Sequence, residues 1–330
     1  MELTLTFLGT AGAVPTPSRS LSATLLQRGG ERFLIDCGEG TQRQLIKAAV
    51  GITQIQRILL THFHADHYLG IPGMFKTWQL WGRTEPVEVF GPRGLSDMLE
   101  LFRRLIGRVD FPIRWQELVP GDVLTGAGYR VVAIATDHRI ASVGYAFYEE
   151  ARPGRFCPER AAALGIEAGP AYGQLQHGET VTAPGGRVVH PSEVMGPVRP
   201  GRRVVLTGDT RPCPAVVEAA TDADVLVHEA TFTNAERERA GETGHATAAE
   251  AALVARAAQV RLLVLTHSSF RHTARDLLQE ARPIMEPCLL PADFDRLIIP
   301  FSERGAPQLL RPGQDVPSAD QTGLASQTSS

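Results

Sequence analysis

Three histidines and an aspartate stand within six positions of one short segment, Ile58-Leu59-Leu60-Thr61-His62-Phe63-His64-Ala65-Asp66-His67. The apolar run at its start has the pattern of a buried strand. His62 and His64 are two positions apart, which puts them on the same side of an extended chain rather than of a helix. Imidazole and carboxylate groups together suit zinc and similar divalent metals. The segment therefore predicts a metal site where this strand ends.

A pair of catalytic metals about 3.5–4 Å apart needs more ligands than one loop can supply, so a dinuclear centre requires partners elsewhere in the chain. Three candidates each follow the end of a predicted strand, which is a rigid place to mount a ligand; they are His138, Asp209 and His267. A purely structural metal site is the alternative interpretation. Structural zinc usually closes with four ligands, often cysteines, so the larger set favours a catalytic centre that is open to water.

Short apolar runs must position these side chains, and such runs alternate with segments of helical spacing along most of the chain. The predicted strands are Leu3–Leu8, Ala23–Gln27, Arg32–Asp36, Ile58–Thr61, Val87–Phe90, Tyr129–Thr136, Val143–Phe147, Arg203–Leu206, Val225–His228 and Leu262–Thr266. The predicted helices are Gln42–Ala49, Tyr68–Trp81, Leu95–Leu105, Ala215–Ala220, Ala246–Ala258 and Ala274–Ala281. This order predicts an α/β (α+β) protein whose sheets are covered by helices on the outside.

Residues 149–203 differ in composition from the rest of the chain, with nine glycines and seven prolines among 55 residues. That density argues against a packed core and predicts an irregular, protruding arm. Beyond Ser302 the chain is rich in Ser, Gln, Pro and Gly and poor in apolar residues, so we predict disorder for residues 303–330. The expected organisation is one catalytic domain at residues 1–302, with the arm inserted at about 149–203.

The bulk composition is that of an ordinary soluble globular protein, with 43% hydrophobic and 21% charged residues. A net charge of −3 gives no basic footprint of nucleic-acid binding, and the arginines are spread instead of clustered. No segment has the length of a membrane span or the pattern of a signal peptide. The four cysteines are scattered without a CxxC pair, which fits a reducing cytoplasm.

The HxHxDH segment, followed by a later His, Asp and His, resembles the signature of the metallo-β-lactamase superfamily, whose fold is an αββα sandwich with the metals at one edge. This resemblance implies two zinc ions, for which Mn²⁺ or another divalent metal is an alternative. By the same resemblance, one zinc is held by His62, His64 and His138, the second is held by Asp66, His67 and His267, and Asp209 bridges them.

Further segments are similar to those of one family in this superfamily, ribonuclease Z. The similar segments follow each other in the family's order and extend to about residue 303. They are Phe7–Gly12, Asp36–Leu45, Val227–Phe232, Gly244–Thr247 and Ser268–Arg271. Asp36 is expected to support a metal-bound histidine from behind.

Three places in the chain resemble the parts of ribonuclease Z that contact its substrate. The Gly/Pro-rich segment lies where the family has an arm that grips the tRNA elbow, with Gly169 and Pro170 at the family's GP motif. Arg271 stands in the arginine-bearing stretch after the last ligand. Pro15–Ser20 resembles the family's PxKxRN loop but keeps only the proline and Arg19. This departure leaves open whether precursors that bear CCA are cut.

The resemblance implies a zinc-dependent endoribonuclease that cleaves the 3′ trailer from precursor tRNA, leaving a tRNA 3′-hydroxyl and a trailer with a 5′-phosphate. Asp66 is expected to orient or deprotonate the attacking water. His245 is expected to act as general acid or as a hydrogen-bond donor to the transition state, with its ring oriented by Glu229. The resemblance also implies a cytoplasmic homodimer. Two other functions stay open: another hydrolase on this scaffold, of the arylsulfatase or phosphodiesterase type, and a tRNA- or metal-binding protein without catalysis.

Overall fold

Two β-sheets packed face to face form the larger part of the structure, a computed structural model that describes residues 1–314. The first sheet has the order β17-β16-β1-β2-β3-β4-β5-β6, and the second has the order β15-β14-β13-β12-β9-β8-β7. The strands of the first sheet are β1 (Leu3–Gly9), β2 (Ala23–Arg28), β3 (Glu31–Ile35), β4 (Arg57–Leu59), β5 (Val87–Gly91), β6 (Ile113–Glu117), β16 (Arg296–Ile298) and β17 (Gln308–Leu310). Those of the second are β7 (Val123–Gly126), β8 (Tyr129–Ala135), β9 (Val143–Glu149), β12 (Arg203–Leu206), β13 (Val225–Glu229), β14 (Leu263–Thr266) and β15 (Cys288–Leu289).

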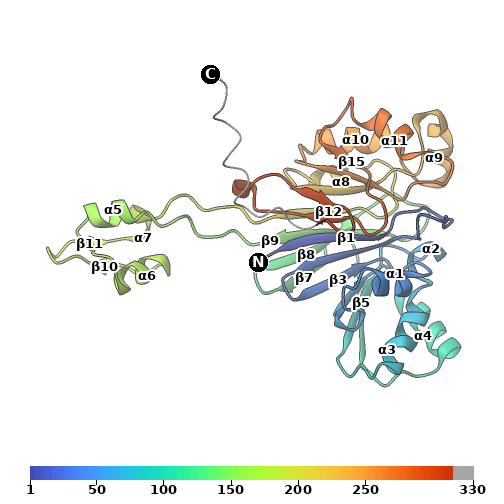
Figure 1. Ribbon diagram of the computed structural model, residues 1–330, viewed down its shortest axis with the longest axis horizontal. Helices are drawn as coiled ribbons and strands as arrows, with labels where there is room; N and C mark the ends of the chain where they lie inside the picture. The colour runs from blue at the N-terminus through green and yellow to red at the C-terminus, as the bar shows by residue number, and fades with distance from the viewer. Residues whose placement is uncertain (315–330) are drawn as a thin grey trace. The chain divides into compact units, whose positions relative to one another are not determined.

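Helices cover the outer faces of both sheets (Figure 1), which is the αββα arrangement that the sequence predicted. Beside the first sheet lie α1 (Thr41–Lys47), α2 (Ala65–Tyr68), α3 (Ile71–Leu80), α4 (Leu95–Ile106) and the short 3₁₀ helix η1 (Ile52–Gln54). Beside the second lie α8 (Pro214–Ala219), α9 (Arg237–Thr243), α10 (Ala248–Ala257), α11 (Ala274–Ala281) and η2 (Asn234–Glu236). The prediction of one helix over Tyr68–Trp81 is wrong, because the chain breaks at Gly70. A Cβ there would lie 2.2 Å from the carbonyl oxygen of Gly38.

Parallel pairing turns the carboxyl ends of several strands toward one rim. In the first sheet β3, β4, β5 and β6 are parallel, and in the second β12, β13, β14 and β15 are parallel. Between the sheets the rings of Phe33 and Phe147 pack edge to face at 5.9 Å, and the Tyr145 hydroxyl donates to the carbonyl of Leu60 over 2.6 Å. A single β-bridge joins His62 to Ser142. The residues that follow β4 therefore meet those that precede β9.

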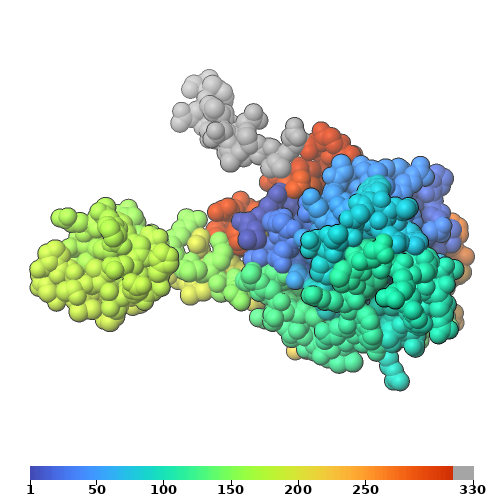
Figure 2. Space-filling model, turned by 90° about the horizontal axis from the view of Figure 1, so that it is seen from below, coloured from blue at the N-terminus to red at the C-terminus, as the bar shows by residue number. Residues whose placement is uncertain are grey.

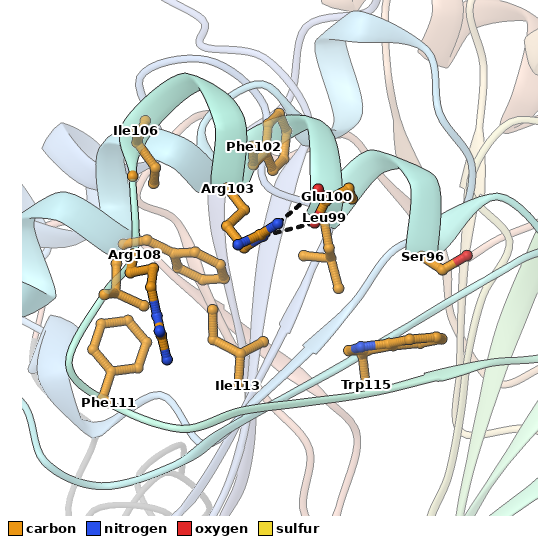
Figure 3. Close-up of a pocket in the computed structure, with 13 residues that line it drawn as sticks. Ser96, Leu99, Glu100, Phe102, Arg103, Ile106, Arg108, Phe111, Ile113 and Trp115 are labelled. Carbon is orange, nitrogen blue, oxygen red and sulfur yellow. Dashed lines mark hydrogen bonds and ion pairs between the residues drawn. The ribbon is translucent and has the colours of Figure 1, made fainter.

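A second apolar layer lies between the first sheet and the helices α1, α3 and α4. Helix α4 turns Leu95, Met98 and Phe102 into this layer, at the three- and four-residue spacing of an amphipathic helix. The same helix exposes Leu101 and Leu105 on its outer side. This face, cyan to green, is turned toward the viewer in Figure 2. Beside it a pocket of about 490 Å³ opens between α4 and β6 (Figure 3), lined among others by Leu99, Ile106, Phe111, Ile113 and Trp115.

Gly126–Arg130 and Tyr148–Arg202 form a second compact unit, called the second unit below. It contains α5 (Pro158–Ala163), α6 (Pro170–Gln176), α7 (Pro191–Val194), β10 (Val181–Thr182) and β11 (Val188–Val189). Its small core buries Ala161, Ile166, Leu175, Ala183, Val189 and Val194. The prediction that the Gly/Pro density prevents a packed core is therefore wrong. Each of the three helices begins with a proline, whose fixed φ suits the first helical position.

The prediction of disorder from residue 303 onward is wrong for its first part. The chain passes through the 3₁₀ helix η3 (Ser302–Arg304), and Gln308–Leu310 pairs antiparallel with Arg296–Ile298 at the edge of the first sheet. These backbone hydrogen bonds and two leucines, Leu309 and Leu310, form a short strand within a stretch that is otherwise poor in apolar residues. The rest of that prediction, residues 315–330, lies outside the described residues. Among residues 1–314, no helix combines the length and apolar character needed to cross a membrane.

Candidate metal centre

The rim of the two sheets gathers all seven residues that the sequence predicted as metal ligands. His62 and His64 follow β4, Asp66 and His67 lie in α2, and the other three follow β8, β12 and β14. One group, whose ligand atoms all lie within 4.8 Å of one another, is His62, His64, His138 and Asp209. A second group with the same spacing is Asp66, His67 and His267, and a third is Asp209, His245 and His267. Asp209 therefore lies where the groups meet.

Buried hydrogen bonds fix the orientation of these ligands from behind. Asp36 accepts from Nδ1 of His67 over 2.7 Å and from the Thr61 backbone N–H over 2.8 Å. Nδ1 of His138 donates to the carbonyl of Gly244 over 2.7 Å. His267 has φ of 56°, a left-handed conformation that is uncommon for residues other than glycine. Such contacts set which ring nitrogen carries the proton and aim the other at the metal.

The donor set fits a divalent cation. Nδ1 of His267 lies 3.0 Å from the Thr231 hydroxyl, and that hydroxyl donates to Glu229 over 2.6 Å, so Nδ1 of His267 carries the proton. Nδ1 of His67 likewise donates to Asp36. The two Nε2 atoms of His67 and His267 are therefore bare lone pairs, and they face each other at 3.2 Å. Lone pairs this close repel unless a cation lies between them.

Carboxylates make the centre a place of negative potential. Burial, which raises a carboxyl pKa, is outweighed at Asp209 by His267, His67 and His62, which hold its pKa well below the usual range. At Asp66 burial is likewise outweighed by the neighbouring imidazoles of His267 and His67, which lower its pKa. Oδ1 of Asp209 is buried and has no hydrogen-bond partner among residues 1–314. Ionised oxygens without a donor are ligands for a metal ion.

Burial also lowers the pKa of the three histidines in the first group, His62, His64 and His138. A lowered pKa keeps an imidazole neutral, and the neutral form is the one that binds a metal. His67 behaves differently, because Asp209 and Asp36 outweigh burial and raise its pKa well above the usual value. A metal ion bound between these carboxylates would supply that positive charge in place of a proton, and Nε2 of His67 would then be free to ligate it.

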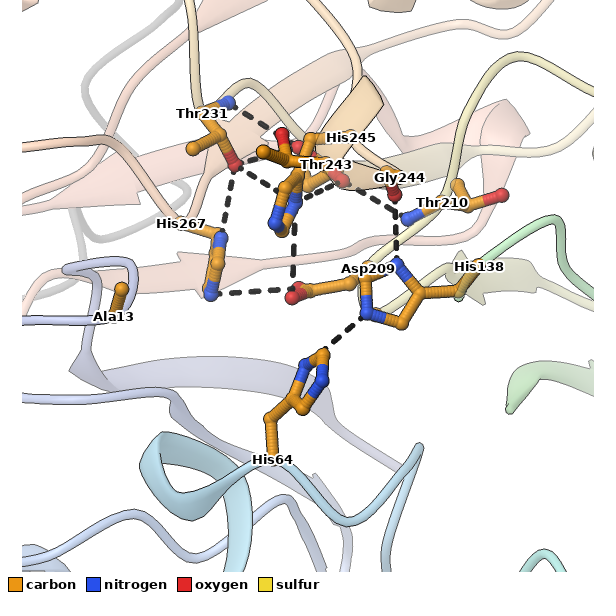
Figure 4. A network of polar contacts seen from close by, with 12 residues as sticks. Ala13, His64, His138, Asp209, Thr210, Thr231, Thr243, Gly244, His245 and His267 are labelled. Atoms are coloured by element: carbon orange, nitrogen blue, oxygen red, sulfur yellow. Dashed lines mark hydrogen bonds and ion pairs between the residues drawn. The ribbon is translucent and has the colours of Figure 1, made fainter. Parts of the chain in front are cut away.

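His245 lies in the same centre, beside His138 and His267 (Figure 4). Its Nδ1 is 2.9 Å from the buried carboxylate of Glu229, and its ring stacks on that of His267 with centroids 5.6 Å apart. Burial lowers the pKa of His245, but Glu229 and Asp209 outweigh it and raise the pKa to about 9. Glu229 also accepts from the backbone N–H of Thr210. The arrangement holds a protonated imidazole at a fixed angle.

The four predicted substrate-binding residues do not join this cluster. Arg19 is half-buried and donates to the carbonyl of Pro291, and Arg271 lies 3.0 Å from Glu236 on the surface. Gly169 and Pro170 are exposed at the start of α6, within the second unit. Their part in substrate binding stays a prediction.

Two contributors to the centre escaped the sequence analysis. Thr231 touches Glu229 and His267 together, and the backbone N–H of Ala13 donates to Oδ2 of Asp66 over 2.8 Å. Thr231 lies two residues after Glu229, within the Val227–Phe232 segment that resembles ribonuclease Z. Its place in that segment was the only feature of the sequence that could have indicated a role at the site. The Ala13 N–H could not be predicted as a donor from the sequence, because every residue except proline has a backbone N–H. His228 is buried in β13 with Nδ1 on the carbonyl of Glu229, outside the three ligand groups.

Comparison with known proteins agrees with the fold and the centre. The family model of the metallo-beta-lactamase superfamily matches residues 19–267. Ribonuclease Z of Methanosarcina acetivorans is 47% identical over 302 residues, 91% of this chain and 99% of its own length. Ribonuclease Z of Myxococcus xanthus is 50% identical over 283 residues, 85% of this chain and 92% of its own length. The crystal structure of human tRNase Z, short form, has a TM-score of 0.65 and 30% identity, covering 90% of this chain and 99% of its own.

Fold and centre thus define a metal-dependent hydrolase of the metallo-β-lactamase class. Within that class, the chain belongs to the ribonuclease Z family of endoribonucleases. The predicted fold class and the predicted hydrolase activity are confirmed by this membership.

Proposed function

We propose that the chain removes the 3′ trailer from precursor tRNA by hydrolysis, leaving a tRNA 3′-hydroxyl and a trailer with a 5′-phosphate. The observation that carries the proposal is the convergence of two bare imidazole nitrogens, on His67 and His267, beside a buried Asp209 that belongs to two ligand groups. Relatives that share nearly the whole chain are named ribonuclease Z. The alternative, another phosphodiesterase or an arylsulfatase on this scaffold, has no specific observation in its favour.

We assign two zinc ions to the centre, with Mn²⁺ as the alternative metal. His62, His64 and His138 would hold one ion, Asp66, His67 and His267 would hold the other, and Asp209 would be shared between them. When bound, such a pair lowers the pKa of water so that hydroxide is present near neutral pH, and it neutralises charge on the phosphoryl oxygens. The first two ligand groups, and the presence of Asp209 in both the first and the third, support this division.

The side chains around the ligands supply orientation and a proton. The water oxygen bonds to phosphorus, the bond from phosphorus to the 3′ oxygen breaks, and the phosphate stays on the trailer. Asp66, which accepts from the Ala13 N–H, orients the attacking water and takes its proton. His245 donates a proton from Nε2 to the departing 3′ oxygen, because Nδ1 is already held by Glu229. Glu229 thereby fixes both the charge and the direction of the ring.

The test is incubation with a 3′-extended precursor tRNA, with and without an encoded CCA, followed by mapping of the new 3′ end. A single cut at the base of the acceptor stem, lost with a chelator and restored by zinc, is the expected result. The paired substrates also settle the question left open by the Pro15–Ser20 loop. Cleavage of bis(p-nitrophenyl) phosphate without any cleavage of the precursor contradicts the proposal and favours the alternative hydrolase. Binding of tRNA without turnover contradicts catalysis.

We also propose that the chain is a homodimer. The exposed apolar side chains of α3, α4 and β6 support this partner, since one of them lines the pocket between α4 and β6 and a second copy offers the same surface. They are Leu80, Leu101, Leu105 and Trp115. Replacing Leu101 and Leu105 together by Glu should convert a dimer to a monomer in light scattering. A wild-type chain that is monomeric at all concentrations contradicts the proposal.

The second unit is proposed as the part that contacts the tRNA elbow, through Gly169 and Pro170. Its own compact core supports this, because a packed unit can present a defined surface. Arg19 and Arg271 are proposed to contact the acceptor end. A cytoplasmic location is proposed with them, since precursor tRNA is the substrate and the four cysteines are free.

A further inference from the structure

The turn between β8 and β9 carries an arginine directly beside a metal ligand. His138 and Arg139 are neighbours in this turn. The turn is anchored at both ends: the hydroxyls of Thr136 and Ser142 are 2.7 Å apart, and the backbone N–H of Asp137 donates to the Thr210 hydroxyl over 2.9 Å. A further backbone bond runs from the Arg211 N–H to the carbonyl of Asp137 over 2.8 Å. Arg139 therefore starts from a fixed backbone position at the edge of the centre.

The stem of the Arg139 side chain lies along the residue that precedes His245. A Cβ added to Gly244 would be 3.0 Å from Cγ of Arg139 and 2.9 Å from Nδ1 of His138. The bare backbone of Gly244 thus lets both residues approach it closely. Arg139 is held between the turn that bears His138 and the loop that bears His245. It is exposed to solvent at that point.

Other arginines around the centre have protein partners. Arg211 pairs with Asp137 at 3.0 Å and donates to the carbonyl of Gly241. Arg271 pairs with Glu236, and Arg19 donates to the carbonyl of Pro291. The guanidinium of Arg139 makes no hydrogen bond or ion pair with any residue from 1 to 314. Five N–H donors in a planar fork are therefore available for an anion.

We propose that Arg139 binds a phosphate of the RNA backbone that neighbours the scissile phosphate. The inference rests on the proposed function and adds a residue to it. The metal centre takes the scissile phosphate, and Arg139 lies one residue from a ligand of that centre, so its long side chain reaches the next phosphate along the strand. A planar guanidinium binds two oxygens of one phosphate, which a lysine cannot do. The nucleotide that bears this phosphate lies either on the tRNA side or on the trailer side of the cut.

The first test measures binding of a precursor tRNA to metal-free protein in EDTA, across a series of salt concentrations. Arg139→Ala should weaken binding by about tenfold and reduce the salt slope by about one. Arg139→Lys should recover part of the affinity. The matched control is Arg256→Ala. Arg256 is an exposed arginine in the last turn of α10, and this variant should bind the precursor like the wild type. Equal affinity and equal slope in Arg139→Ala and Arg256→Ala overturn the proposal.

The second test identifies the phosphate. Two precursors carry an uncharged methylphosphonate in place of the phosphate one position before or one position after the cut. On one of these precursors the difference between wild type and Arg139→Ala should vanish, both in binding and in kcat/KM of the metal-loaded enzyme. The position of the methylphosphonate in that precursor shows whether Arg139 binds a phosphate on the tRNA side or on the trailer side of the cut. A penalty that persists undiminished on both precursors overturns the proposal. If wild-type protein never cuts the natural precursor, the proposed function fails, while the binding comparison still decides the role of Arg139.

Discussion

The metal centre and the second unit differ in what holds their functional residues in place. In the centre, the buried Asp36 and the hydroxyl of Thr231 each contact several groups, and they hold the rings of His67 and His267 in place. In the second unit a small apolar core and an ion pair between Glu149 and Arg202 hold the fold, while Gly169 is exposed. A substitution in the centre should change chemistry at nearly constant stability. A substitution in the second unit should change stability and RNA binding but leave the chemistry intact.

Metal removal should give the largest effect, and it should affect the metal centre but not the second unit. Dialysis against a chelator should reduce cleavage of both precursor tRNA and a small phosphodiester to background, since the ligands alone supply no nucleophile. Zinc should restore both activities. The second unit contains none of the three ligand groups, so its protease resistance should be the same with and without metal. Retention of cleavage after complete metal loss, checked by elemental analysis, contradicts the assignment.

The next largest effect should come from His245. Replacing it with Ala removes the protonated imidazole beside Asp209, and turnover should fall by about 10²–10⁴-fold. The seven residues assigned as metal ligands remain in place without it, so metal content should stay at the wild-type level. Glu229→Gln keeps the shape of the side chain but loses its charge, so its turnover should lie between that of the wild type and that of His245→Ala. Unchanged turnover in single-turnover kinetics removes His245 from the mechanism.

Breaking the ion pair of the second unit should have the next effect, on stability instead of chemistry. Glu149 holds Arg202 through two contacts of 2.6 and 2.8 Å, and both side chains are almost fully buried. Glu149→Ala removes the carboxylate that faces this buried guanidinium, at a cost of about 3–5 kcal/mol. Hydrogen exchange and limited proteolysis of residues 148–202 report the loss.

The exposed pair of Arg187 and Glu193 in the same unit is the matched control, and Arg187→Ala should cost less than about 1 kcal/mol. In Glu149→Ala, hydrolysis of a small phosphodiester should match the wild type while kcat/KM for precursor tRNA falls. Loss of both activities together would show that the two regions are not separable in this way.

The smallest effect should come from Thr231, which the sequence did not single out as a site residue. Thr231→Val removes the hydroxyl that lies between Glu229 and His267 at nearly constant volume. Metal affinity or turnover should fall by about 10–100-fold, as for other residues that orient a metal ligand. Thr231→Ser restores the hydroxyl and should recover most of the loss. Equal zinc affinity and turnover in the Val and Ser variants would assign Thr231 to packing alone.

Much of this architecture could be predicted from residue type and spacing. His62 and His64 lie on one side of an extended segment because side chains alternate along a strand, and His138, Asp209 and His267 could be found because each follows an apolar run. The packing of the second unit could not be predicted in the same way. The density of Gly and Pro predicts an irregular chain, whereas Pro158, Pro170 and Pro191 each begin a helix in the structure.

The sequence by itself determined which residues can bind a cation and which strands deliver them, because ligand chemistry and side-chain alternation are local properties. Tertiary structure decided which of them meet. Residues 67 and 267 lie 200 positions apart, yet their Nε2 atoms are 3.2 Å apart because parallel strands of two sheets end at one rim. It also decided that Gly244, which has no side chain, packs against Arg139. The same folding brings the carbonyl of Gly244 to His138 and the N–H of Ala13 to Asp66. Backbone groups are the same in every residue, so only the fold can give them a role.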